Sequence, residues 1–269
     1  MTELAILLLR IFVAFTVLAF GACVGAWWYY RTKRGIDLDA GFEGQYDYHG
    51  QAIYNQQGEI EGYELLLREL DSATGEWRLP AHVLDFPLLR IVAEIQRLVP
   101  HLEDNVEFIT INLTLKQILD FRSDQFIAWT QSILAGRRLD IELDALEIIG
   151  CNFIQRWRLK KRLRAITARN IPIVIEGVDS TRLMYRRLLP FLERVTHVKF
   201  VANAFNKSAT HWIEVTLGEW QLATQKAQVG MILGKIERLY QEQLADQLHI
   251  PYRQGYLYAR PEKIEREDH

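Results

Sequence analysis

The chain opens with one long apolar segment and then changes to short apolar stretches separated by polar residues. The segment from Ile11 to Tyr30 has no charged residue over twenty positions, which is the length that a helix needs to cross the hydrocarbon core of a bilayer. Four aromatic residues close it, as in an interfacial belt, and three cations follow within residues 31–34. The pattern predicts a membrane-spanning helix near the N-terminus.

This pattern also predicts the organisation and location of the protein. We expect an uncleaved anchor over residues 1–30 with residues 4–30 contacting the membrane, a polar linker over 31–46, and one domain over 47–269. The cations that follow the segment outnumber Arg10 before it, so the positive-inside rule predicts a single-pass protein of the inner (cytoplasmic) membrane with its C-terminal domain in the cytoplasm. Gly21 to Gly25 fits a GxxxG pattern, which favours a homodimer or a membrane protein partner, although glycine is common in any membrane helix.

After residue 46 the pattern alternates between strand-like and helix-like periods. The ranges typical of strands are 51–56, 58–68, 107–114, 139–145, 171–178 and 197–205. The ranges typical of helices are 80–102, 123–136, 152–170, 181–195 and 218–248. Repeated βα units predict a parallel sheet with crossover helices, and this many units favour closure into a (β/α)8 TIM-type barrel.

Composition narrows the function only a little. The chain of 269 residues has a net charge of −2 and is 49% hydrophobic, which gives no argument for a nucleic acid polymer as partner. Cys23 and Cys151 are the two cysteines of the sequence, too few for a disulfide framework. Walker, Rossmann and Ser-His-Asp patterns are missing from the sequence.

Polar side chains recur where the predicted strands end. They are Glu64, Asn112, Glu142, Glu176, Lys199 and Gln254. In a barrel of this type the carboxyl ends of the strands carry the functional groups. Carboxylate and amide oxygens suit Mg²⁺ or Mn²⁺, whereas any one of these residues taken alone is more simply a strand-end group bonded to a loop.

The stretch "GYELLLR" (residues 62–68) resembles the signature of EAL-domain proteins, the cyclic di-GMP phosphodiesterase family. The resemblance continues in "ITINLT", "IELDA", "HVKF" and "YRQGYLYARP", in the family's order. It implies a modified (β/α)8 barrel and cyclic di-GMP as the ligand. It also implies that Glu64, Asn112, Glu142 and Glu176 match the ligands of one metal ion, with Glu176 replacing an Asp, and that Glu64 and Lys199 match catalytic positions.

The second metal site of the family is not matched. Spacing to Lys199 aligns Glu176 to Asp179 with the family's Asp-Asp-Phe-Gly, so that Gly177 stands where a second Asp is usual. Counting back from Gln254 places the late acidic motif on Leu233 to Glu237, with Gly234 at its first Glu. We therefore expect one Mg²⁺ or Mn²⁺ at most and vestigial or weak catalysis, because in-line phosphodiester hydrolysis uses two ions.

The groups that hold the nucleotide are retained by the same resemblance. Arg68 matches a phosphate-contacting arginine, and Gln51, Asn112 and Gln254 match polar ligand contacts. The alternative for Arg68 is a buried salt bridge with Glu64 or Glu142.

The sequence is compatible with three functions. The first is a membrane-anchored degenerate EAL domain that acts as a cyclic di-GMP receptor. The second is an active phosphodiesterase that hydrolyses cyclic di-GMP to the linear dinucleotide with Mg²⁺ or Mn²⁺. The third is a ligand-free adaptor that works through protein contacts.

The range from Arg156 to Arg169 contains seven basic residues and no acidic one. It is either a patch for anionic lipid or for an acidic partner, or simply a solvated barrel helix.

Overall fold

The computed structural model describes residues 2–33, 42–206 and 212–264. The chain divides into two units, Met1–Phe42 and Glu43–His269.

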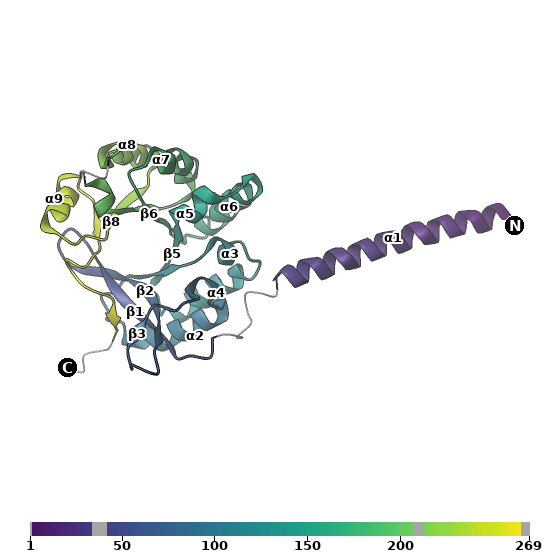
Figure 1. The fold of residues 1–269 in the computed structure, drawn as a ribbon, viewed down its shortest axis with the longest axis horizontal. Helices are drawn as coiled ribbons and strands as arrows, with labels where there is room; N and C mark the ends of the chain where they lie inside the picture. The colour runs from purple at the N-terminus through teal and green to yellow at the C-terminus, as the bar shows by residue number, and fades with distance from the viewer. Residues whose placement is uncertain (1, 34–41, 207–211, 265–269) are drawn as a thin grey trace. The chain divides into compact units, whose positions relative to one another are not determined.

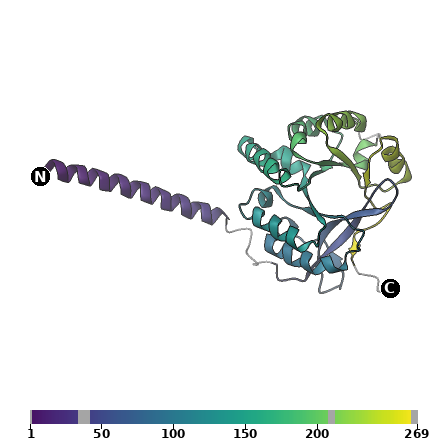
Figure 2. The ribbon, with the colours of Figure 1, turned by 180° about the vertical axis from the view of Figure 1, so that it is seen from behind.

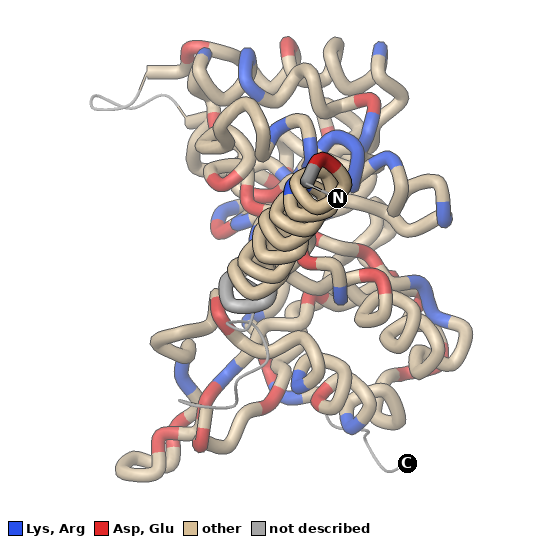
Figure 3. The backbone as a smooth tube through the Cα atoms, turned by 90° about the vertical axis from the view of Figure 1, so that its right-hand side faces the viewer, with Lys and Arg blue, Asp and Glu red and all other residues tan. Residues whose placement is uncertain are grey.

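The first unit contains the helix α1 (Thr2–Lys33). Its stretch Glu3–Tyr29 is long and apolar enough to cross a membrane, with a mean hydropathy of 2.5 and none of its length buried. The helix is almost entirely free of charged residues in Figure 3. It continues three residues past the expected end of the anchor at Tyr30. Most of the expected linker, residues 34–41, lies outside the described residues, and the first strand begins at Tyr46.

The second unit is a closed barrel of eight strands, as Figures 1 and 2 show. The strands are β1 (Tyr46–Tyr54), β2 (Ile60–Leu70), β4 (Phe108–Asn112), β5 (Arg138–Asp144), β6 (Ile173–Val178), β7 (His197–Val201), β8 (Gly230–Gly234) and β9 (Tyr252–Arg253). Their order around the barrel is β1-β9-β8-β7-β6-β5-β4-β2, and β2 pairs with β1 to close it. Strand β1 is antiparallel to both neighbours, whereas the pairs from β2 to β9 are parallel. The predicted barrel is confirmed.

Helices and short outer strands surround this barrel. The α-helices are α2 (Leu88–Leu98), α3 (Leu115–Ile118), α4 (Ser123–Ile133), α5 (Ala145–Gly150), α6 (Phe153–Thr167), α7 (Arg182–Leu188), α8 (Leu217–Ala227) and α9 (Leu239–Gln247). The 3-10 helices are η1 (Val83–Asp85), η2 (Val99–His101), η3 (Leu189–Arg194) and η4 (Ala202–Phe205). The outer strands are β3 (Trp77–Arg78), paired with β2, and β10 (Glu262–Lys263), paired with β1.

The strands are buried because their side chains are apolar on both faces. Ile109, Ile141 and Ile175 on three successive parallel strands are all 0% exposed. Continuous Ile, Val and Leu runs are typical of parallel strands covered by helices. The core therefore lies between the strands and the surrounding helices, and it leaves the strand ends for polar groups.

The expected long helix over residues 218–248 is wrong. The structure ends α8 at Ala227, where Gln228 adopts a left-handed backbone with φ 58°. The apolar run Gly230–Gly234 then forms β8 between β7 and β9. Periodicity cannot separate a short buried strand from a helical segment. Here the backbone pairing with β7 and β9 makes this segment a strand.

Candidate active site

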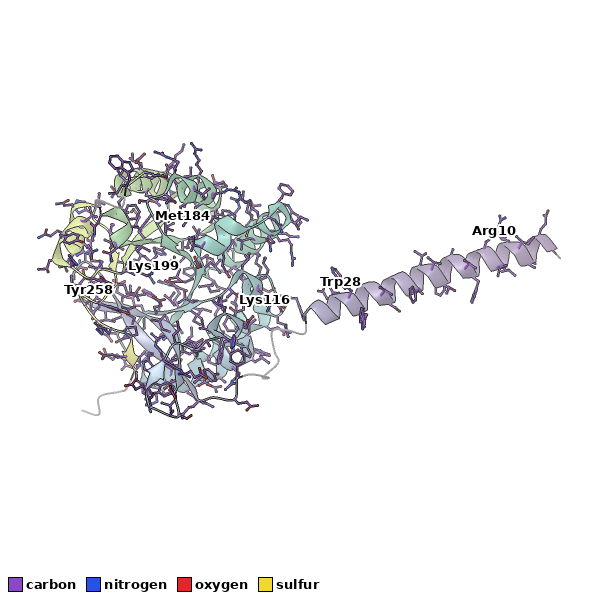
Figure 4. The ribbon with its side chains drawn as sticks, viewed as in Figure 1. Arg10, Trp28, Lys116, Met184, Lys199 and Tyr258 are labelled. Carbon is purple, nitrogen blue, oxygen red and sulfur yellow. The ribbon has the colours of Figure 1, made fainter. Side chains whose placement is uncertain are left out.

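The predicted polar residues meet at the carboxyl ends of the parallel strands. Register places Asn112 of β4 beside Glu142 of β5, and Asp144 of β5 beside Glu176 of β6. Lys199 of β7 lies inside the ring of strands (Figure 4). The barrel thus brings residues that are far apart in sequence together in one buried cluster.

Lys199 is the centre of this cluster. Its Nζ lies 2.7 Å from Glu64 Oε2 and 3.1 Å from each carboxylate oxygen of Glu142. All three side chains are at least nine-tenths buried. Burial opposes the charge of Lys199, but the surrounding Glu142, Glu64 and Glu176 raise its pKa, so the side chain is an ammonium. Lys199, which the resemblance places at a catalytic position, bridges two carboxylates in this structure.

Glu64 receives more hydrogen bonds than its neighbours in the cluster. Asn112 Nδ2 donates to its Oε1 at 2.7 Å, and Gln254 Nε2 donates to its Oε2 at 2.9 Å. Burial acts to raise the pKa of Glu64, but Lys199 and these two amides outweigh burial and lower it. Glu64 is therefore an ionised carboxylate.

The pKa values of Glu142 and Glu176 are shifted in the opposite direction, upwards. Burial raises the pKa of Glu142 well above its usual value; Lys199 opposes this shift, and the neighbouring Glu64 and Glu176 reinforce it. Burial also raises the pKa of Glu176, which Lys199 again opposes. One ammonium thus faces three acidic side chains, and the cluster can accept further positive charge.

The residues present fit one divalent ion. Oxygen atoms of Glu64, Glu142 and Glu176 lie within 4.8 Å of one another. The Oδ1 of Asn112 is buried and has no hydrogen-bond partner among the described residues. Three carboxylates and an orphaned amide oxygen form the hard oxygen set that Mg²⁺ and Mn²⁺ prefer. When bound, such an ion would supply Lewis-acid polarisation of a phosphodiester or of its attacking water.

No second acidic cluster of this kind occurs in the part of the chain that the structure describes. Gly177 has φ +74° and Gly234 ends β8, and neither offers a ligand atom. A Cβ on Gly234 would lie 3.2 Å from Cε and 3.3 Å from Cγ of Lys199. The missing side chain at Gly234 thus leaves room for the Lys199 stem.

A cavity of about 490 Å³ opens above the cluster. Its lining residues are Gln51, Glu64, Leu66, Arg68, Leu79, Asn112, Glu176, Lys199, Lys235, Glu237, Gln254, Tyr256 and Pro261. Every residue predicted for metal or ligand contact lines it except Glu142, which lies beneath Lys199 and is 1% exposed. The volume is in the usual range for a small-molecule site.

The polar wall of this cavity is held in place by hydrogen bonds. Gln51 Nε2 donates to the Ala259 carbonyl at 3.1 Å, and Gln254 Nε2 lies 3.4 Å from Gln51 Oε1. Arg68 Nη1 donates to the Leu67 carbonyl at 2.9 Å. Among the described residues Arg68 makes no ion pair with Glu64 or Glu142, and it lines the cavity.

Three polar residues of the cavity wall were not predicted from the sequence: Lys235, Glu237 and Tyr256. Lys235 and Glu237 lie in the range aligned with the late acidic motif, in which Gly234 stands at the first acidic position. Their position directly after a strand end was the available signal.

Solved structures with this fold are EAL-domain proteins. The YkuI protein of Bacillus subtilis, which has an EAL domain and was solved with c-di-GMP and calcium, matches with a TM-score of 0.63 and 19% identity over 81% of this chain and 55% of YkuI. The FimX EAL domain of Pseudomonas aeruginosa, solved with c-di-GMP, matches with a TM-score of 0.61 and 15% identity over 81% of this chain and 91% of that chain. The EAL enzyme Bd1971, in its form with cAMP and cyclic-di-GMP, matches with a TM-score of 0.62 and 15% identity over 96% of this chain and 73% of that chain.

No family model and no curated protein sequence matches the chain. The structural matches show that the barrel has the EAL-domain fold, as its motifs predict. At identities below 20% the matches establish the fold and not the ligand.

Proposed function

We propose that this protein is a membrane-anchored, degenerate EAL domain that binds cyclic di-GMP as a receptor and hydrolyses it weakly or not at all. The observation that carries the proposal is the pairing of a retained ligand cavity with a single acidic cluster already bridged by Lys199. Two-metal hydrolysis needs carboxylates on both ions. The glycines at positions 177 and 234 supply none.

The cavity suits a cyclic dinucleotide in chemistry as well as in size. Arg68 presents a guanidinium that can bind a phosphodiester through two parallel hydrogen bonds. Gln51, Asn112 and Gln254 offer amide groups of the kind that hydrogen-bond base edges. Tyr256 and Leu66 add aromatic and apolar surface on which a purine can pack.

The helix α1 supports a membrane location, because Glu3–Tyr29 satisfies the length and hydropathy of a spanning segment. The positive-inside rule then puts the barrel in the cytoplasm, where a cyclic dinucleotide would reach it. The receptor state would be relayed to a membrane protein partner or within a homodimer.

Calorimetry on the full chain in lipid nanodiscs tests the receptor role. We expect saturable heat with cyclic di-GMP and a loss of about 100-fold in affinity for Arg68→Ala, since a charge-assisted bidentate contact is removed. Arg78→Ala is the matched control, because Arg78 lies on β3, pairs with Asp71 at 2.8 Å and does not line the cavity. Absence of heat for the unmodified chain would leave the adaptor function.

An active phosphodiesterase is the second candidate, and the unpartnered Asn112 Oδ1 beside three carboxylates favours it. If the bound ion suffices for catalysis, Mn²⁺ will drive conversion of cyclic di-GMP to the linear dinucleotide. Loss of a metal from a phosphoryl-transfer site costs on the order of 10³-fold in rate or more. Rapid turnover that disappears in Glu64→Gln would overturn the receptor proposal.

A further inference from the structure

Lys235 has an unusual backbone conformation for its place in the fold. Five non-glycine residues of the described chain have positive φ. Four of them, Ala135, Asn170, Gln228 and His249, follow the ends of helices α4, α6, α8 and α9. Lys235, with φ 55°, instead follows strand β8 at the rim of the cavity. Left-handed backbone is unfavourable for a residue with a Cβ, and such strain gathers at functional sites.

The residues around Lys235 hold it in this conformation. On one side Gly234 is in register with Val201 of β7. On the other side the Ile236 amide donates to the Gln254 carbonyl at 3.0 Å, and the Ile236 carbonyl accepts from Leu257 at 2.9 Å. The backbone is therefore fixed on both sides of Lys235, and a glycine would meet the same requirement at lower cost.

The side chain of Lys235 is exposed and lines the cavity. It has no hydrogen bond or ion pair within the described part of the protein, even though Glu237 lines the same wall. Arg68 and Lys199 are the other cations of the lining, and Lys199 is fully engaged with Glu64 and Glu142. Lys235 is thus the uncommitted ammonium of this cavity.

We propose that Lys235 is a phosphate-binding residue that supplies the positive charge of the missing second ion, so that this site binds cyclic di-GMP without a divalent metal. The inference rests on the proposed function. It explains why a strained lysine stands one residue after the position that lacks an acidic metal ligand. A single mobile ammonium stabilises a bound phosphodiester, but it cannot activate a water as a metal ion does.

Calorimetry with cyclic di-GMP in excess EDTA tests this role, again on the full chain in nanodiscs. Lys235→Gln removes the charge and keeps the length, whereas Lys235→Gly removes the side chain and relieves the left-handed backbone. We expect both variants to lose about tenfold in affinity, the size of one charge-assisted hydrogen bond. Lys226→Gln, an exposed lysine on α8 away from the cavity, is the control and should bind as the unmodified chain does.

Thermal unfolding separates binding from stability. We expect Lys235→Gly to raise the melting temperature by roughly one to a few degrees and Lys235→Gln to leave it unchanged. An affinity loss shared by two variants that differ in stability supports the charge as its cause. Unchanged or tighter binding in both variants would overturn the inference, as would an absolute requirement of the unmodified chain for Mg²⁺ or Mn²⁺. If the unmodified chain binds nothing with or without metal, the proposed function itself fails.

Discussion

The two ends of the barrel both bury acidic side chains, but the cation that faces them is 40% exposed at one end (Arg138) and buried at the other (Lys199). At the amino ends of the strands, Arg138 pairs with Asp140 at 2.7 Å and lies 4.6 Å above the ring of Phe108. Tyr252 packs against both Phe108 and His197. At the carboxyl ends, the buried Lys199 faces three acidic groups, and the cavity beside them is lined by both polar and apolar side chains.

The difference separates a structural use of charge from a functional one. At the amino end the buried Asp140 is paired with one partly exposed arginine beside aromatic rings. One cation for three acids leaves the carboxyl end able to take up a metal ion or a proton. The following substitutions test whether the two ends of the barrel differ in their ability to take up a cation.

Removing the cation at each end should have the largest effect. Lys199→Met leaves three acidic groups without an ammonium, and breaking a buried ion pair costs about 3–5 kcal/mol in the free energy of unfolding. Added Mn²⁺ should recover part of this loss, because the same oxygens can bind it. Urea unfolding followed by tryptophan fluorescence, in EDTA and in Mn²⁺, measures both quantities.

Arg138→Met is the matched change at the amino end. It leaves Asp140, whose pKa burial already raises, without its partner. We expect a loss that Mn²⁺ does not restore. Equal rescue of both variants by Mn²⁺ would show that the carboxyl end holds no particular affinity for a cation.

Two glycines of β8 allow a smaller comparison of the same ends. A methyl group on Gly230 would overlap the ring of His197, whereas one on Gly234 would press on the flexible stem of Lys199. We expect Gly230→Ala to lower the free energy of unfolding by about 1–3 kcal/mol through overpacking, and Gly234→Ala by less than about 1 kcal/mol. If denaturant titrations show a larger loss for Gly234→Ala than for Gly230→Ala, the carboxyl end is the more tightly packed of the two.

A further effect concerns the pH dependence of stability at the amino end. Burial, together with the nearby Arg138, lowers the pKa of His197 to about 4. In the unfolded chain His197 binds a proton near pH 6.5, whereas in the folded chain it stays neutral until about pH 4. The free energy of unfolding therefore falls as the pH drops from about 6.5 towards 4. We expect His197 to account for on the order of 1–2 kcal/mol of this fall.

Unfolding titrations at about pH 7.5, 5.5 and 4.5 measure this fall in the free energy of unfolding. His197→Gln should flatten the pH dependence, and the exposed His82→Gln should not. A steeper slope in His197→Gln would contradict the assignment.

Much of the barrel and of the site was predictable from the sequence because each polar residue stood within or near the end of an apolar strand. Glu64, Asn112 and Glu142 could be placed together from strand endings alone. Strand β8 could not be found, since Gly230–Gly234 is too short to distinguish its period. The bridge from Lys199 to two carboxylates and the backbone of Lys235 depend on side-chain packing and dihedral angles, which the order of residues does not display.

The strand β9 has only two residues, and it meets β1 at a single register pair, Tyr54 with Arg253. The cylinder therefore has a seam, crossed beside that pair by the amides of Gln51 and Gln254. Local opening is easiest where few backbone hydrogen bonds must break. If the proposed cyclic dinucleotide contacts both glutamines, it holds β1 and β9 together across this seam. We then expect slower amide hydrogen exchange along β1 and β9 when the nucleotide is bound.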